Sequence, residues 1–120
     1  MTQNDFDTIT LAALEAMGAD GRDALPFGAV GLDPDGLCQV YNATEARMSG
    51  LDPAIVLGVP FFDAVGQCMN NFMVAQRFED EAELDEVLPY VLTLRMRPTR
   101  VRLRLLAHPD APRRYVLIER

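Results

Sequence analysis

The 120-residue chain contains no lysine, no tryptophan, one histidine and two cysteines. The single histidine, His108, lies in a proline-bounded turn and does not support a nucleophilic triad or a haem ligand. The sequence has neither a glycine-rich phosphate loop nor a cluster with metal-ligand spacing, so it does not indicate an enzyme. No apolar run approaches the roughly 18 residues that a membrane span requires, and the first residues carry no basic group of a signal peptide. We therefore expect a cytoplasmic protein without a membrane segment.

The charge is acidic, with a formal net charge of −7, and all 11 basic residues are arginine. An acidic chain is repelled by the nucleic-acid backbone unless its basic groups cluster. One such cluster alternates with apolar residues and consists of Arg95, Arg97, Arg100, Arg102 and Arg104. Because period-two alternation is typical of strands with one buried face, we interpret these arginines as a solvated outer sheet face rather than a nucleic-acid surface. The alternation leaves open a role in weak homodimerisation or partner docking.

The N-terminal part of the chain predicts a helical cap followed by a hairpin. Apolar residues at helical spacing predict a helix over 8–17 with Asp7 as its N-cap, within a cap of residues 1–24. Strands are expected over 27–32 and 37–41, on either side of the turn Asp33-Pro34-Asp35-Gly36. Cys38 in the second of these strands is interpreted as a small buried hydrophobic residue.

The rest of the chain predicts short helices and then strands. Asn42 and Asp52 are expected to cap helices over 43–48 and 53–57, and a third helix is expected over 60–65. The segment 69–78 reads as a helix or a turn-rich loop. The final strands are predicted over 88–96, 100–107 and 114–118. This order indicates an α+β fold, with a five-stranded antiparallel sheet and short helices on one face, as a domain of residues 25–120.

Three ionisable residues lie in apolar surroundings. Tyr41 and Glu45 are four residues apart, a spacing that predicts neighbouring turns of one helical face. Cys68 follows the apolar stretch 59–65. A phenol, a carboxyl and a thiol that face one dry pocket would suit a buried, ionisable ligand attached through sulfur. Taken singly, such a glutamate is usually a surface residue and such a cysteine usually packs in a core.

Several motifs resemble the photoactive yellow protein family. They are Leu25-Pro26-Phe27-Gly28-Ala29-Val30, Tyr41-Asn42-Ala43, Ser49-Gly50-Leu51-Asp52-Pro53, Phe61-Phe62, Cys68 and Met96-Arg97-Pro98-Thr99. The resemblance is close over 25–68 and 96–99 and weak over 69–88. It implies a PAS fold and a blue-light photosensor, with p-coumaric acid (4-hydroxycinnamic acid) bound to Cys68 as a thioester.

The resemblance also implies roles for the other site residues. Tyr41 and a protonated Glu45 would donate hydrogen bonds to the chromophore's phenolate, and Ser49 would bond the tyrosine. The remaining candidates for the chromophore pocket are Leu51, Phe61, Phe62 and Met96, the last of which would assist thermal recovery. Leu51 stands where the family commonly has an arginine, and this difference is expected to change water access, colour and recovery rate.

The signal implied by the resemblance is a charge made inside the protein. After isomerisation, proton transfer from Glu45 would leave a buried carboxylate, which costs several kcal/mol, and partial unfolding at the N-terminal cap would expose a surface to an unidentified signalling partner. Two other functions fit the sequence less closely. One is a PAS domain with haem, flavin, a metabolite or no cofactor, and the other is an interaction module that acts by dimerisation or partner binding.

Overall fold

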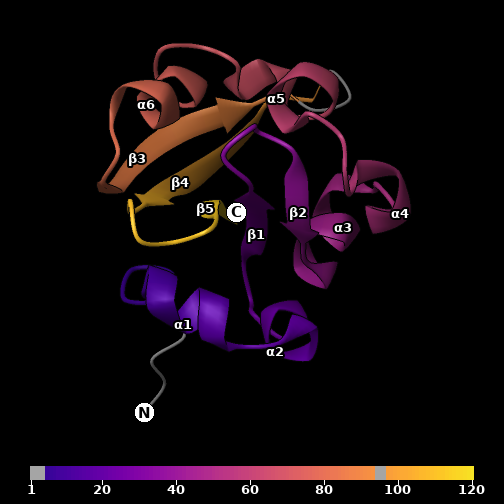
Figure 1. Ribbon diagram of the computed structural model, residues 1–120. Coiled ribbons are helices and arrows are strands. Elements are labelled where there is room, and N and C mark those ends of the chain that lie inside the picture. Colours follow the sequence, from indigo (N-terminus) through magenta and orange to yellow (C-terminus); the bar gives the residue numbers. More distant parts are fainter. Residues whose placement is uncertain (1–4, 94–96) are drawn as a thin grey trace.

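The computed structural model describes residues 5–93 and 97–120, and a single antiparallel sheet forms its centre (Figure 1). The strands are β1 (Gly28–Leu32), β2 (Cys38–Tyr41), β3 (Leu84–Leu92), β4 (Thr99–Ala107) and β5 (Arg114–Glu119). Their order in the sheet is β2-β1-β5-β4-β3, so the first and last strands of the sequence are paired at its centre. The predicted five-stranded antiparallel sheet is confirmed.

Short helices surround this sheet. Those before the first strand are α1 (Leu11–Ala16) and α2 (Ala19–Asp23). Those between β2 and β3 are α3 (Ala43–Ser49), α4 (Pro53–Val56), α5 (Phe61–Ala64), the 3₁₀ helix η1 (Gln67–Met69) and α6 (Ala75–Asp80). Figure 1 shows α1 and α2 well separated from α5 and α6. Across residues 5–93 and 97–120, no helix has the length and apolar character needed to cross a bilayer.

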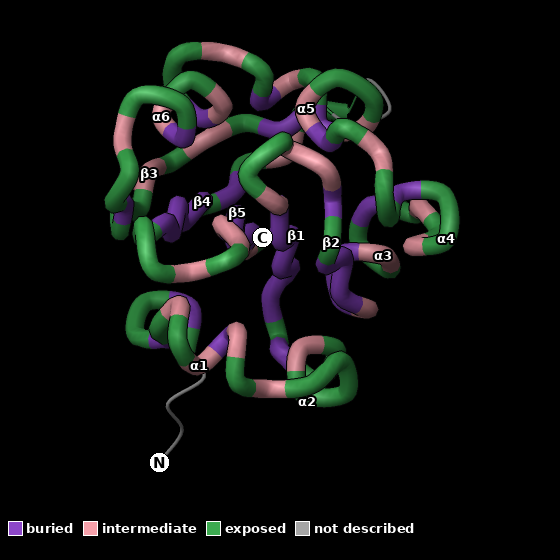
Figure 2. The backbone as a smooth tube through the Cα atoms, viewed as in Figure 1, coloured by how far each residue is buried: buried purple, intermediate pink, exposed green. Residues whose placement is uncertain are grey.

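Both faces of the sheet are covered, because alternate strand residues contribute to two separate cores. Val30 and Leu32 pack into the core beneath the helices that follow β2. Ala29 faces the other core, to which the N-terminal segment contributes Phe6 and Ile9. All five residues of β1 are therefore buried, and Figure 2 shows this strand as a continuous buried stretch.

Local turn and capping chemistry accounts for the short elements. The side chain of Asn42 accepts a hydrogen bond from the Glu45 N–H (3.1 Å), and Asp52 accepts one from the Ala54 N–H (2.9 Å). Gly50, at φ 77°, ends α3 in the left-handed conformation that favours glycine. Both predicted caps are confirmed. The prediction for Asp7 is wrong, because α1 begins at Leu11 with Thr10 as its N-cap.

The predicted start of the third strand in the sequence order is also wrong. Strand β3 covers Leu84–Leu92, so it begins before the predicted residue 88 and within an acidic segment. Residues 94–96 of the predicted range 88–96 lie outside the described residues. Since β3 is an edge strand, its acidic side chains remain in solvent while Leu84 and Leu92 are buried. The short helix α2 was not predicted either, because Gly18 and Gly21 read as helix ends.

Arg104 departs from the predicted solvated arginine face. Its guanidinium is buried and donates hydrogen bonds to the carbonyls of Phe6 (2.9 Å) and Ile9 (2.6 Å) and to Asp85 (2.9 Å). Arg102, two residues earlier on β4, donates a hydrogen bond to Asp7, and its guanidinium carbon lies 4.8 Å from the centre of the Phe6 ring. The N-terminal segment therefore covers this face of the sheet, whereas Arg100 remains exposed. Arg95 lies outside the described residues.

Candidate functional site

Asn42 joins the elements that carry the candidate site. Its side-chain oxygen accepts the N–H of Ala29 on β1 (2.9 Å) as well as that of Glu45 on α3 (3.1 Å). Its amide donates to the carbonyls of Arg22 (2.9 Å) and Phe27 (3.0 Å). This buried side chain thus fixes the start of α3 against β1 and α2.

Tyr41 is the last residue of β2, so it does not share a helical face with Glu45 as the spacing predicted. Its buried hydroxyl lies 2.7 Å from the Ser49 Oγ, and that oxygen also accepts the Leu51 N–H (3.2 Å). Burial raises the pKa of Tyr41 to about 12, and the nearby Glu45 acts in the same direction. The phenol therefore keeps its proton at neutral pH and remains a hydrogen-bond donor.

Glu45 is buried on α3 and forms a bidentate ion pair with Arg120, which follows β5. The distances are 2.7 Å from Oε1 to Nη1 and 3.2 Å from Oε2 to Nη2. In this arrangement both carboxyl oxygens accept hydrogen bonds, whereas the sequence led us to expect a protonated, donating Glu45. Arg120 was not singled out in the sequence, where nothing relates it to a glutamate 75 positions earlier.

Cys68 lies on η1 and is half-buried. Its carbonyl accepts hydrogen bonds from the Tyr90 hydroxyl (2.5 Å) and the Asn71 amide (3.3 Å), and that amide also donates to the Tyr90 hydroxyl (2.6 Å). Tyr90 and Asn71 therefore fix the turn that carries the thiol, although sequence reasoning placed neither of them among the site residues. They come from β3 and from a loop, and no motif links them.

The other cysteine has a different environment. Cys38 is fully buried on β2, and its thiol donates to the Val40 carbonyl (3.3 Å). Burial raises the pKa of Cys38 to about 12, so the thiolate that would act as a nucleophile is scarce at neutral pH. The prediction that Cys38 is a buried hydrophobic residue is confirmed.

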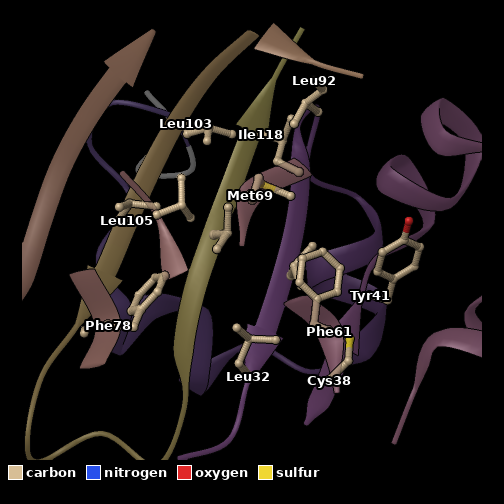
Figure 3. Packing of buried hydrophobic residues seen from close by; sticks show 14 of the residues in the cluster. Leu32, Cys38, Tyr41, Phe61, Met69, Phe78, Leu92, Leu103, Leu105 and Ile118 are labelled. Carbon is tan, nitrogen blue, oxygen red and sulfur yellow. The ribbon is translucent and has the colours of Figure 1, made fainter. Parts of the chain in front are cut away.

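An apolar cluster joins the candidate residues. Tyr41, Phe61 and Leu92 belong to one buried cluster (Figure 3). Leu51, Phe62 and Cys68 pack against this cluster. The rings of Phe61 and Phe62 meet edge to face, with centres 5.4 Å apart. Met96 lies outside the described residues.

Two hollows flank this cluster. One of about 230 Å³ opens beside Ser49 and is lined also by Arg47, Arg97 and Arg120. The other, of about 310 Å³, lies beside Phe61, Phe62 and Asn71. The site thus combines a half-buried thiol, a buried phenol–hydroxyl pair and a buried ion pair around an apolar centre.

The raised pKa values predict a loss of stability at alkaline pH. In the folded chain Cys38 and Tyr41 keep their protons to about pH 12, whereas the unfolded chain releases them near the ordinary values of 9.0 and 10.0. The stabilisation that the two protonated side chains give the folded chain is therefore complete below pH 9.0 and is lost as the pH rises toward 12. Urea denaturation at about pH 8 and about pH 11 should show a decrease of about 2–3 kcal/mol from Cys38 alone. In Cys38→Ala the decrease should be smaller, and equal stability at both pH values would contradict the prediction.

Known proteins resemble the chain in sequence and in structure, although no family model matches it. Photoactive yellow protein from Rhodothalassium salexigens is 32% identical over 96 residues, which cover 78% of this chain and 77% of that protein. Photoactive yellow protein from Rhodobacter capsulatus is 30% identical over 124 residues, which cover 98% and 93%.

Solved structures of photoactive yellow protein and PAS domains also match the fold of this chain. The photoactive yellow protein domain of the sensor histidine kinase Ppr from Rhodospirillum centenum matches with a TM-score of 0.83 at 33% identity, over 91% of this chain and 98% of that domain. The PAS domain of an HTR-like protein from Haloarcula marismortui matches with a TM-score of 0.64 at 20% identity, over 92% and 98%, and shares the fold.

Proposed function

The chain belongs to the photoactive yellow protein family, and from this premise we propose that it senses blue light through p-coumaric acid bound to Cys68 as a thioester. It is a PAS photoreceptor domain rather than an enzyme. The observation that carries the proposal is the buried Tyr41–Ser49 pair, because Tyr41 belongs to the apolar cluster against which the Cys68 side chain packs.

Cys68 fits the attachment of an acyl group. The half-buried thiol can be reached by an activated p-coumaroyl thioester, unlike that of Cys38. The bond from Sγ to the acyl carbon would form as the donor's own carbon–sulfur bond breaks, and the thiol proton would leave with the donor's thiol. Since a thioester is uncharged, it can lie against Phe61 and Phe62 without a counter-ion.

Tyr41 fits the recognition of the phenolic end. The chromophore, when bound, supplies absorption of blue light, a double bond that isomerises and a phenol oxygen that carries negative charge. A buried anion is costly unless fixed donors surround it. The Tyr41 hydroxyl keeps its proton and can donate, and Ser49 Oγ accepts the Leu51 N–H and holds the phenol in place.

Glu45 would act as a second donor when protonated and would leave a buried carboxylate after releasing its proton. We propose that this change reaches the N-terminal segment through β5, because that strand connects Arg120 to Tyr115. The Tyr115 hydroxyl donates to Glu15 of α1 (2.6 Å), and Arg113 bonds the same carboxylate (3.0 Å). Release of α1 would expose a surface to a signalling partner.

Incubation of the purified protein with a p-coumaroyl thioester tests this function. We expect the intact mass to increase by one p-coumaroyl group, together with a visible band that blue light bleaches and that recovers in the dark. A visible band from a bound compound without a mass increase would indicate a non-covalent cofactor and contradict the proposal. The absence of both would favour an interaction module.

A further inference from the structure

The ion pair of Glu45 and Arg120 is buried, whereas pairs such as Arg102–Asp7 and Arg102–Glu119 are exposed. The side chain of Glu45 is 3% exposed and that of Arg120 is 13% exposed. Two parallel N–H···O bonds match the planar guanidinium to the carboxylate. The positive charge of Arg120 compensates the negative charge of the buried Glu45 carboxylate. Removal of either side chain would leave the charge of the other buried and uncompensated.

The surroundings of Glu45 point to Arg120 as its counter-ion. Within the part of the chain that the structure describes, the guanidinium bonded to Glu45 is that of Arg120. Arg47, on the same helix, has its Nη2 3.4 Å from the Thr44 hydroxyl, and Arg97 lines the hollow beside Ser49. Tyr41, on which Glu45 acts electrostatically, has its hydroxyl 2.7 Å from the Ser49 Oγ.

The sheet leaves room for this pair at Gly28. A Cβ atom at position 28 of β1 would lie 2.1 Å from Glu45 Oε1, far inside contact distance. The carboxyl therefore occupies a space that exists because the strand has no side chain there. This close fit places Glu45 beside the end of β5, where Arg120 reaches it.

We propose that Arg120 is the counter-ion of Glu45, that it keeps Glu45 a carboxylate before any chromophore is bound, and that it controls whether Glu45 can donate a proton. The last part rests on the proposed function, and the first two parts do not. Arg120 is thus a positioning residue that acts through Glu45. For Glu45 to donate a hydrogen bond to a phenolate beside Tyr41, its carboxyl must take up a proton and give up the two bonds to Arg120.

Carbon-13 NMR of the glutamate carboxyl groups in the chromophore-free protein tests the charge directly. Glu45→Gln identifies the Glu45 signal by its disappearance. At neutral pH we expect this signal at the carboxylate position in the unsubstituted protein and in Arg120→Lys, and at the carboxylic-acid position in Arg120→Gln. Arg100→Gln, which removes an exposed arginine from β4, should leave it unchanged. A carboxylic-acid signal in the unsubstituted protein, or a carboxylate signal that persists in Arg120→Gln, would overturn the proposal.

The visible spectrum of the loaded protein tests whether Arg120 acts through Glu45. Arg120→Gln should shift the absorption maximum when Glu45 is present and leave it unshifted in the Glu45→Gln background. An equal shift in both backgrounds would mean that Arg120 acts on the site without Glu45 and would overturn that part. The outcomes separate the two proposals, because failure of Cys68 to take up the acyl group would not change the NMR result. Conversely, a protonated Glu45 in the chromophore-free protein would leave loading at Cys68 intact.

Discussion

Replacing Cys68 with alanine is expected to abolish covalent loading and, with it, the visible absorption band. The reason is chemical, because alanine has no nucleophile and the acyl group would have no bond to the protein. The loss should be complete in intact-mass measurements after incubation with a p-coumaroyl thioester. Urea denaturation should show that the variant remains folded, since the Tyr90 and Asn71 bonds reach the backbone carbonyl of residue 68 and not its side chain.

Cys38→Ala supplies the matched control for this experiment. Cys38 is fully buried, and its thiol is engaged with the Val40 carbonyl, so an acyl donor cannot reach it without opening the core. The control variant should therefore gain the same mass and the same colour as the unsubstituted protein. A p-coumaroyl adduct on Cys68→Ala would show that attachment occurs elsewhere and would refute the assignment.

Replacing Arg104 with methionine is expected to lower the free energy of unfolding by about 3 kcal/mol and to release the N-terminal segment. The methionine side chain is apolar like the aliphatic part of the arginine but has no N–H group to donate. The carbonyls of Phe6 and Ile9 would then lose their donors, and Asp85 would lose its partner. Urea denaturation measures the loss of stability, and faster amide exchange over residues 5–17 would show where the structure loosens.

Arg100→Met is the appropriate control, because Arg100 lies on the same strand and is exposed. Its effect should stay within about 0.5 kcal/mol, as for most surface substitutions. Equal effects of the two substitutions would show that Arg104 is not a special anchor of the N-terminal segment. Unchanged amide exchange in Arg104→Met would lead to the same conclusion.

The parts of the fold that depend on local chemistry could be predicted from the sequence. The caps at Asn42 and Asp52 bond N–H groups within three residues, and the turn at residues 33–36 relies on Gly36 at φ 85°. The parts that depend on distant partners could not. Arg104 alternates with apolar residues like its neighbours, and it is buried because carbonyls more than 90 positions earlier reach it.

The candidate site divides in the same way. Tyr41, Ser49 and Cys68 were named from motifs. In the structure Tyr41 belongs to the apolar cluster, Cys68 packs against it, and Ser49 contacts the Tyr41 hydroxyl. Arg120 and Tyr90 were missed, because each meets its partner only through the assembled sheet. A single arginine after the last strand carries no local pattern that distinguishes a buried counter-ion from a surface charge.

The pairing of β1 with β5 has a consequence for synthesis on the ribosome. Residues 28–32 can form their hairpin with β2 as soon as both have emerged, but their other neighbour spans residues 114–119. The centre of the sheet must therefore wait until residues 114–119 have been synthesised. The N-terminal segment must wait with it, because Arg104 on β4 bonds Ile9, and Tyr115 on β5 and Arg113 just before β5 bond Glu15 of α1. Such long-range closure is slow compared with the folding of helical bundles. Until then the apolar strand β1 has one open edge, so translation is the period in which this chain is most exposed to aggregation.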